Sequence, residues 1–253
     1  MPATPAWPPK SAPRLFVEPT LAEGQSRRIG GNAAHYLGSV MRAAPGDAVV
    51  LLDDVSGEWA ARVEVVAKRH VEVTVVERLR VREAVPDLWL CIAPVKKPHF
   101  DLVIEKATEL GVAKIVPVLT RRGVVDKVNG ERVRAIMTGA AEQCARTALP
   151  ELGELMTLPK LLAGWPEGRA LFFADEALAA GGEGMAAAQI FAAHRGPAAL
   201  LIGPEGGFDE AERALVRGHG AARAVALGPR ILRAETAAIA GVALWMASAG
   251  DWR

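Results

Sequence analysis

The strongest chemical signal in the sequence is a glycine-rich turn that follows a short apolar run. Segment Leu200–Asp209 reads LLIGPEGGFD, so three glycines and one carboxylate, that of Glu205, come after an expected strand. Glycines let the backbone approach a ligand closely and adopt φ values that other residues avoid. Asp209, with Glu212 three residues later, predicts a capping box that starts a helix directly after the turn. A tight strand–helix turn without a ligand has the same composition, and the pattern alone fits both interpretations.

This turn differs from the common phosphate-binding loops. It lacks the Gly-Lys-Ser/Thr of a Walker loop and does not follow the G-x-G-x-x-G pattern of dinucleotide-binding proteins. Because no lysine accompanies Glu205, the carboxylate would repel a triphosphate. We therefore expect a neutral or cationic ligand that resembles a nucleoside.

A second segment, Val225–Thr236 (VALGPRILRAET), repeats the order of strand, Gly-Pro turn and helix. Arg230 and Arg233 fall where the helix should begin, and positive charge at that end opposes the helix dipole. Such a placement indicates that the arginines hold a phosphate or a developing oxyanion, or else pair with neighbouring carboxylates. Ligands of open α/β sheets bind at the carboxyl ends of strands, so the two turns together favour a binding site.

Other polar groups are less specific. Glu142 and Arg146 are four residues apart on an expected helix, and that spacing alone favours a surface pair. Lys96–Lys97 and Arg121–Arg122 each follow an expected strand and fit either phosphate contacts or solvated loops. The five histidines share no metal-ligand spacing, and they indicate neither a metal site nor a Ser–His or Cys–His pair. Cys144, on an apolar helix face, is expected in the core.

The elements that position these residues fall into two regions. Residues 14–84 contain short strands close together in sequence, which is typical of a small antiparallel barrel or sandwich. We expect strands at Arg14–Glu18, Ala48–Asp53, Trp59–Val66 and Val71–Val76, and a helix at His35–Arg42. The mixed-charge stretch Glu77–Asp87 is the natural linker.

From residue 85 onward, strands and helices alternate, which predicts an α/β domain with a mostly parallel sheet. Strands are expected at Leu88–Ala93, Lys114–Leu119, Leu171–Ala174, Ala198–Ile202 and Ala222–Leu227. Helices are expected near 100–110, 131–147, 209–219 and 231–249. Gly111 stands where a left-handed helix cap would lie. No element is predicted for Leu152–Gly168 or Ala177–Gly184.

Length and composition limit the class of protein. The chain has 253 residues, which at about 150 per domain means one large or two modest domains. Thirty Lys and Arg residues against 29 Asp and Glu residues exclude a domain that binds nucleic acid by bulk charge. No apolar run approaches the roughly 20 residues of a membrane helix. The Pro- and Ala-rich residues 1–13 predict a flexible extension rather than a secretion signal, so we expect a cytoplasmic protein.

Several separated motifs together resemble one known family. The two glycine turns, Leu201–Gly207 and Leu227–Thr236, closely resemble the signature loops of the bacterial 16S ribosomal RNA uridine-N3 methyltransferases, which belong to the SPOUT class. Further matching motifs occur in the same order at His35–Leu37, Val40–Arg42, Gly46–Asp47, Lys106–Gly111 and Glu142–Gln143 with Arg146 and Pro150. The resemblance spans roughly residues 14–249, and Met41, Pro98–Asp101 and Gly123 depart from the usual pattern.

The resemblance implies a fold and a cofactor. After the extension at 1–13, it implies a PUA-like β-barrel RNA-binding domain at 14–84 and a trefoil-knotted α/β methyltransferase domain at 85–253. It also implies a homodimer with the active site between two subunits, no metal, and S-adenosylmethionine as the cofactor, whose cationic sulfonium suits Glu205. The residues implied to hold the cofactor are Ile202, Gly203, Pro204, Glu205, Gly206, Gly207, Leu227, Gly228, Pro229, Arg230, Ile231, Leu232 and Thr236.

The implied activity is methylation of N3 of a uridine in the 16S RNA of the small ribosomal subunit. Arg233, together with Arg230, is expected to stabilise charge on the uracil oxygens, and Glu205, Glu235 or solvent to accept the N3 proton. Arg146 is a further catalytic candidate. Contacts with RNA are expected from Arg27, Arg28, Arg42, Lys96, Lys97, Arg122, Glu142 and Gln143. The alternatives are a ribose 2′-O-methyltransferase of the same class and a non-catalytic RNA-binding protein with the same fold.

Overall fold

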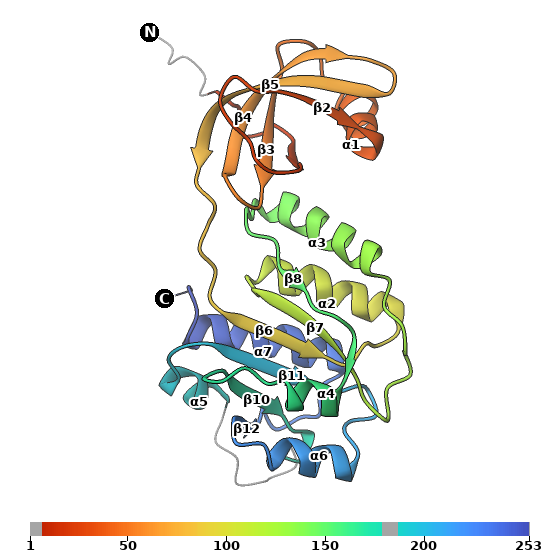
Figure 1. Ribbon diagram of the computed structural model, residues 1–253, viewed down its shortest axis with the longest axis vertical. Coiled ribbons are helices and arrows are strands. Elements are labelled where there is room, and N and C mark those ends of the chain that lie inside the picture. The colour runs from red at the N-terminus through yellow and green to blue at the C-terminus, as the bar shows by residue number, and fades with distance from the viewer. Residues whose placement is uncertain (1–6, 179–186, 253) are drawn as a thin grey trace. The chain divides into compact units, whose positions relative to one another are not determined.

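The computed structural model describes residues 7–178 and 187–252, which form two compact units (Figure 1). The β-unit contains the chain up to Ala84 together with Ala141–Leu149, and the α/β unit contains Val85–Ala140 and the chain from Pro150 onward. The return of Ala141–Leu149 to the β-unit is a feature that the sequence does not indicate. Residues 1–6 of the predicted extension and most of the unassigned segment Ala177–Gly184 lie outside the described residues.

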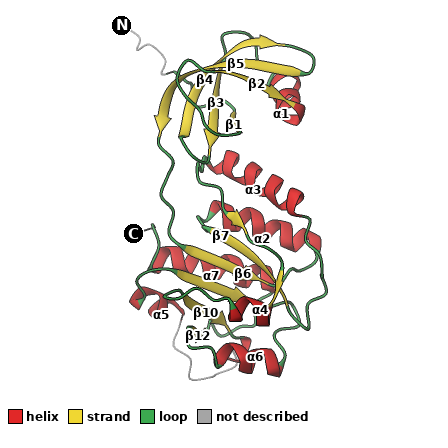
Figure 2. Cartoon of the chain, in the orientation of Figure 1, coloured by secondary structure: helices red, strands yellow, loops and turns green. Residues whose placement is uncertain are grey.

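The β-unit is built on a five-stranded sheet (Figure 2). Along the sheet the strands are β1 (Arg14–Phe16), β3 (Ala48–Asp53), β4 (Gly57–Val66), β5 (His70–Arg80) and β2 (Ser26–Gly30). All neighbours are antiparallel except β1 and β3, which pair in parallel and so depart from the all-antiparallel prediction. The predicted alternation in β5 is confirmed, because Val71, Val73 and Val75 are buried in one core.

The β-unit differs from the prediction in its helix, in the length of β5 and in β2, a strand that was not predicted. The helix begins earlier than expected, with α1 at Gly31–His35, and continues as a π-helical turn over Tyr36–Val40. Strand β5 runs past Val76 to Arg80, so the predicted linker begins too early. The reason is cross-strand pairing, since Arg80 Nε donates to Glu58 of β4 at 3.0 Å.

The described part of the N-terminal extension contacts the β-unit. Ala12 is buried, and the Pro13 carbonyl accepts a hydrogen bond from Val50 N at 2.9 Å. The Arg62 guanidinium lies 4.9 Å from the centre of the Trp7 ring. Residues 7–13 therefore bury surface, which their composition alone does not predict.

The α/β unit contains a parallel sheet, as predicted. Its strand order is β12 (Ala222–Val225), β10 (Ala170–Ala174), β11 (Ala198–Ile202), β6 (Leu88–Ile92), β7 (Lys114–Leu119) and β8 (Glu151–Leu152), with β9 (Met156–Thr157) also paired to β7. Its helices are α2 (Lys97–Glu109), α3 (Gly130–Cys144), α4 (Leu158–Ala163), α5 (Ala187–Ala193), α6 (Glu210–Arg217) and α7 (Ala234–Ser248). Every strand pair is parallel.

Both faces of this sheet are covered, which explains its continuous apolar strands. Side chains alternate along each strand, so Leu90 and Ile92 face one way and Cys91 the other. Buried residues of α2, α3, α5 and α7 pack on the first face, and those of α4 and α6 on the second (Figure 1). Gly111 follows α2 with a φ of +96°, which confirms the predicted left-handed cap.

The end of α3 differs from the predicted helix at 131–147. Ala145 has a φ of +60°, so α3 ends at Cys144 and the chain turns away. Cys144 is exposed, and its predicted place in the core is wrong. The unassigned segment Leu152–Gly168 holds β9 and α4, whose short lengths leave no clear periodicity. Within the described residues, no helix is both long and apolar enough to span a membrane.

Asp53 organises the β-unit at the end of β3. Its buried carboxylate accepts hydrogen bonds from Leu21 N at 2.8 Å, from Val55 N at 2.7 Å, and from both the backbone N–H and the hydroxyl of Ser56. Burial raises the pKa of Asp53, but these hydrogen bonds outweigh it and hold the pKa below its usual range. The carboxylate thus fixes the turn into β4 and the segment at Leu21 together.

We predict that Asp53→Ala destabilises the protein by about 3 kcal/mol at neutral pH, because buried donors left unpaired cost about 1–3 kcal/mol each. A carboxyl whose pKa is lowered by folding stabilises the protein above its unfolded pKa, about 3.9, and loses that effect as the pH falls further. The difference from wild type should therefore shrink below about pH 4. Urea unfolding from pH 7 to pH 3.5 measures it. Asp47→Ala, which removes one exposed turn contact, is the matched control, and an equal loss in both variants would contradict the prediction.

Candidate functional site

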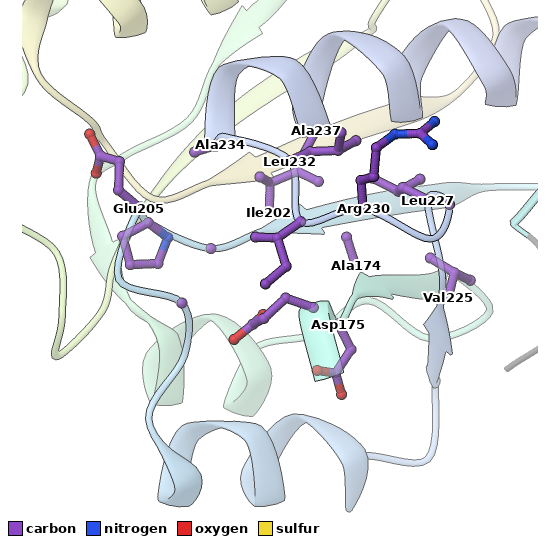
Figure 3. Close-up of a pocket in the computed structure, with 16 residues that line it drawn as sticks. Ala174, Asp175, Ile202, Glu205, Val225, Leu227, Arg230, Leu232, Ala234 and Ala237 are labelled. Atoms are coloured by element: carbon purple, nitrogen blue, oxygen red, sulfur yellow. The ribbon is translucent and has the colours of Figure 1, made fainter. Parts of the chain in front are cut away.

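The two glycine turns and the end of β10 line one pocket of the α/β unit (Figure 3). Strands β12, β10 and β11 are neighbours and parallel, so the residues after Val225, Ala174 and Ile202 meet at one edge of the sheet. The pocket is open to solvent and holds about 590 Å³ of empty space. Its lining residues are Ala174, Asp175, Glu176, Ile202, Gly203, Pro204, Glu205, Gly207, Val225, Leu227, Gly228, Arg230, Ile231, Leu232, Ala234 and Ala237.

The first turn is compact because its glycines make close contacts. A Cβ on Gly203 would lie 2.7 Å from the Phe208 ring, and one on Gly207 would lie 2.3 Å from a Glu176 carboxylate oxygen. Gly207 also has a φ of +66°. The predicted capping box is confirmed, since Glu212 N donates to Asp209 at 2.7 Å and Asp209 N to Glu212 at 3.2 Å.

The residues after β7 hold this turn from outside. Arg122 donates to the Gly206 carbonyl at 3.0 Å, and Arg121 pairs with Asp209 at 3.0 Å. Arg121 N also donates to Glu212 at 2.8 Å. The sequence allowed either phosphate contacts or a solvated loop for Arg121 and Arg122. In the structure both arginines contact the segment of the first glycine turn, and both remain exposed.

The second turn supplies apolar surface and two exposed arginines. Strand β12 ends at Val225 and α7 begins only after Arg233, so both Arg230 and Arg233 precede the helix rather than lying in its first turn. In the described part of the chain, neither arginine forms the ion pair that the sequence left open. Leu227 and Leu232 face the same pocket as Ile202 (Figure 3).

Two acidic residues of the pocket have no counterpart in the prediction. Asp175 and Glu176 directly follow β10 and line the pocket. Asp175 is fully buried and pairs with Arg217 and with Arg213, whose Nε lies 3.2 Å from Oδ1. Arg213 also donates to Glu176 at 2.6 Å. The signal that could have found them is their place directly after an apolar parallel strand, which is the place of both glycine turns.

Glu205 lies at the rim of the pocket. Its side chain is exposed, and Figure 3 shows its carboxylate turned away from Ile202 and Leu232. Three predicted cofactor residues, Gly206, Pro229 and Thr236, are exposed and do not line the pocket. The other predicted cofactor residues do line it.

Glu235 and His99 form a contact that the sequence did not indicate. Glu235 is in the first turn of α7 and His99 in the first turn of α2, and Oε1 of Glu235 lies 3.1 Å from Nδ1 of His99. The glutamate is buried, and the histidine is partly exposed. No sequence pattern links residues so far apart in the chain.

The predicted group at Glu142–Arg146 belongs to the β-unit rather than to the pocket. Glu142 accepts a hydrogen bond from Phe16 N at 2.7 Å, and burial raises its pKa despite that bond. Arg146 follows the turn at Ala145 and is buried, and burial lowers its pKa below the usual range. Gln143 is exposed. Glu142 and Arg146 therefore do not share a helix face.

Backbone hydrogen bonds fix this segment in the β-unit. Thr147 N donates to Glu83 at 2.6 Å, and Glu83 N donates to the Thr147 hydroxyl at 2.8 Å. Leu149 N donates to Asp54 at 3.0 Å. Two carboxylates of the β-unit thus bind the chain directly after α3.

The remaining candidates for RNA contacts lie in both units. In the β-unit, Arg28 is exposed beside His70 and Arg42 is exposed, whereas Arg27 donates to the carbonyls of Glu18 and Thr20 at 2.7 and 3.0 Å. In the α/β unit, Lys96 and Lys97 are exposed at the start of α2. Exposed apolar residues accompany Arg42 at Tyr36, Val40 and Met41.

Matches to known domains define the class of protein. Residues 82–246 match the RNA methyltransferase domain family, and residues 29–76 match the RNA methyltransferase PUA domain family. The pocket and the parallel sheet lie within the first match, and the sheet of the β-unit overlaps the second. The chain therefore has the two domains of an RNA methyltransferase.

Individual relatives and solved structures narrow the class. The chain is 30% identical to ribosomal RNA small subunit methyltransferase E of Bacillus subtilis, with 88% of this chain and 92% of the relative covered. A methyltransferase from Legionella pneumophila, solved with bound SAM, is 31% identical with a TM-score of 0.84, covering 95% of this chain and 99% of that chain. The structure of ribosomal RNA small subunit methyltransferase E from Neisseria gonorrhoeae, bound to S-adenosyl methionine, is 27% identical with a TM-score of 0.85. The match covers 96% of this chain and 100% of that chain. The chain belongs to the ribosomal RNA small subunit methyltransferase E family, which confirms the resemblance of its motifs.

We predict opposite effects for two substitutions of Glu142. Glutamine can still accept the hydrogen bond from Phe16 N without a partly buried charge, so Glu142→Gln should be at least as stable as wild type at pH 7. Glu142→Ala should lose about 1–2 kcal/mol because that donor is left unpaired.

The pH dependence gives a second test by urea unfolding. An acid whose pKa is raised by folding binds its proton more tightly in the folded state, so wild type gains stability as the pH falls from neutral through the folded pKa. Any advantage of Glu142→Gln should therefore disappear near the ordinary glutamate pKa of about 4.3. A glutamine variant as unstable as the alanine variant at pH 7 would contradict the prediction.

Proposed function

We propose that the protein transfers a methyl group from S-adenosylmethionine to N3 of a uridine in 16S RNA of the small ribosomal subunit. The observation that carries the proposal is the pocket between the two glycine turns at the carboxyl edge of the sheet. Family membership supports the RNA substrate, and the ligand of the two related structures supports the cofactor. The choice of N3 rests on the motifs of the two turns.

The residues of the pocket fit S-adenosylmethionine, which supplies an activated methyl group on a cationic sulfur. Ile202, Leu227 and Leu232 offer an apolar surface for the adenine ring. Glu176 gives one side of the pocket a carboxylate that can accept hydrogen bonds from the cofactor, and Arg213 holds Glu176 and the buried Asp175 in place. The backbone at Ile202–Gly207 and Leu227–Leu232 would hold the remaining polar groups.

The arginines of the second turn suit the substrate side. Leu232 and Ala234 line the pocket on either side of Arg233 in sequence, so Arg233 stands at the pocket rim. Uracil N3 becomes nucleophilic when it loses its proton, and the charge then spreads to the two carbonyl oxygens. Arg233, with Arg230, would stabilise that charge. Glu205 at the rim and the buried Glu235 are the carboxylates proposed to accept the N3 proton. The predicted catalytic role of Arg146 also belongs to this proposal.

The RNA must present an unpaired or flipped uridine, because N3 lies on the pairing edge of the base. Arg28, Arg42, Lys96, Lys97 and Arg122 are exposed and would contact the phosphates, with Arg27, Glu142 and Gln143 as the further predicted contacts. Tyr36, exposed six residues before Arg42 in the chain, adds an aromatic ring on which a base can stack. The homodimer, the trefoil knot and the cytoplasmic location that the resemblance implies belong to this proposal.

We predict that Gly207→Ala weakens S-adenosylmethionine binding at least tenfold, about 1.4 kcal/mol. The new Cβ would collide with Glu176 and would strain a backbone with a φ of +66°. Isothermal titration calorimetry measures the affinity. Gly220→Ala is the matched control, because Gly220 has open space at the Cβ position. Equal affinity of the two variants would count against the placement of the cofactor.

We predict that Arg233→Ala lowers methyl transfer by at least about 100-fold while the fold is retained, since losing one charge-stabilising donor typically costs 10²–10³ in kcat. The assay uses cofactor with a labelled methyl group and small subunits from a strain that lacks the modification. Arg223→Ala is the control, because Arg223 is an exposed arginine in β12 outside the pocket. Unchanged turnover in Arg233→Ala would exclude the assigned role.

The labelled product also tests the position of the methyl group. N3-methyluridine blocks Watson–Crick pairing and stops reverse transcription at the modified base. A ribose 2′-O-methyl group leaves the pairing edge intact. A label that does not stop reverse transcription would replace the N3 proposal with 2′-O methylation, and absence of both label and cofactor binding would favour a non-catalytic RNA-binding protein.

A further inference from the structure

His99 and Glu235 form a contact in which the glutamate is buried and the histidine is partly exposed. Oε1 of Glu235 lies 3.1 Å from Nδ1 of His99, and the side chains are 11% and 42% exposed, respectively. A buried carboxylate at Nδ1 holds the imidazole in one orientation and fixes the proton on that nitrogen. Nε2, the other ring nitrogen, is then a proton acceptor. The arrangement is that of a general base and the acid that orients it.

Glu235 borders the pocket in sequence, and His99 contacts Glu235. Glu235 follows Ala234, which lines the pocket, and the helices α2 and α7 cover the same face of the sheet (Figure 1). His99 belongs to the helix that follows β6. Directly after β6, Ala93 N donates to the carbonyl of Ile202 at 3.0 Å, and Ile202 lines the pocket. The pair therefore lies on the β6 side of the pocket, next to the strand that carries the first glycine turn.

We propose that His99 is the general base that removes the N3 proton of the target uridine, and that Glu235 positions it. This inference rests on the proposed function, since it assigns the proton acceptor of that reaction. It replaces Glu205 and Glu235 as direct bases. Glu205 is directed away from the pocket (Figure 3), and the carboxylate of Glu235 is occupied by His99. Imidazole is also the side chain that accepts and releases a proton most readily near neutral pH.

The step balances without any further reactant. The N3–H bond breaks, the proton moves to Nε2 of His99, and the electron pair stays on the uracil. That pair forms the bond from N3 to the methyl carbon as the carbon–sulfur bond breaks and leaves its electron pair on sulfur. His99 then releases the proton to water, to which its partly exposed ring has access.

The other charged groups named near His99 are cations and one carboxylate that is held in an ion pair. Lys96, Lys97 and Arg233 are cations at the starts of α2 and α7. From α3, Arg132 forms an ion pair with Asp101 of α2, its Nε lying 3.1 Å from Oδ1. A pH dependence that disappears with the imidazole can thus be assigned to His99.

The test compares His99→Ala, His99→Gln and Glu235→Gln with wild type in the labelled-methyl assay on small subunits, at several pH values from 5.5 to 9. His194→Gln is the matched control, because His194 precedes β11 at the opposite end of that strand. We expect both His99 variants to lose at least about 100-fold in rate and to lose the rise of rate with pH near neutrality. Glu235→Gln should lose less, since an amide oxygen can still accept from Nδ1. Added imidazole should restore part of the activity of His99→Ala.

Three results would overturn the assignment. The first is a wild-type rate and pH profile in His99→Gln. The second is a slow His99→Ala that imidazole does not rescue. The third is a loss of S-adenosylmethionine binding in the His99 variants, measured by calorimetry, that matches the loss of rate. These outcomes differ from failure of the proposed function itself, in which wild type would place no label at N3.

Discussion

The parallel pairing of β12, β10 and β11 is the constraint on which the site depends. Ala174 is in register with Val225, so β10 and β12 end at the same level, and β11 ends beside them at Ile202. Strand β11 is buried along its whole length, β10 is buried at its centre and β12 is the edge strand. All three leave the sheet at this edge, where backbone groups lose their ladder partners. Glycine turns and charged residues follow at that point, and they create a pocket from segments that are far apart in the sequence.

The local pattern was enough to predict this edge because its signals are short-range. The strands Lys114–Leu119 and Ala198–Ile202 have the predicted bounds, since a strand buried on both faces is a continuous apolar run. The capping box at Asp209 and the left-handed Gly111 depend only on neighbouring residues. The apolar lining and the two glycine turns of the pocket could therefore be predicted without knowledge of the tertiary structure.

What the sequence could not indicate depends on contacts between distant elements. Asp175 matters because Arg213 and Arg217 on α6 pair with it, and His99 matters because α7 brings Glu235 to it. The same limit explains the segment after α3. Helical spacing predicted a pair of Glu142 with Arg146. However, the helix ends before the left-handed Ala145, and carboxylates of the β-unit bind the backbone that follows.

The nearly neutral net charge conceals an uneven distribution of its cations. In the α/β unit, Arg213 and Arg217 neutralise Asp175 and Glu176, and Arg132 pairs with Asp101, so these charges cancel locally. Arg230, Arg233, Lys96 and Lys97 are exposed and form no ion pair within the described residues. All four follow the carboxyl ends of β12 or β6, so they gather at the edge that holds the pocket. A chain with a net charge of +1 can therefore attract a polyanion to that edge, because the cations that lie there form no ion pair within the described residues, whereas Arg213, Arg217 and Arg132 do.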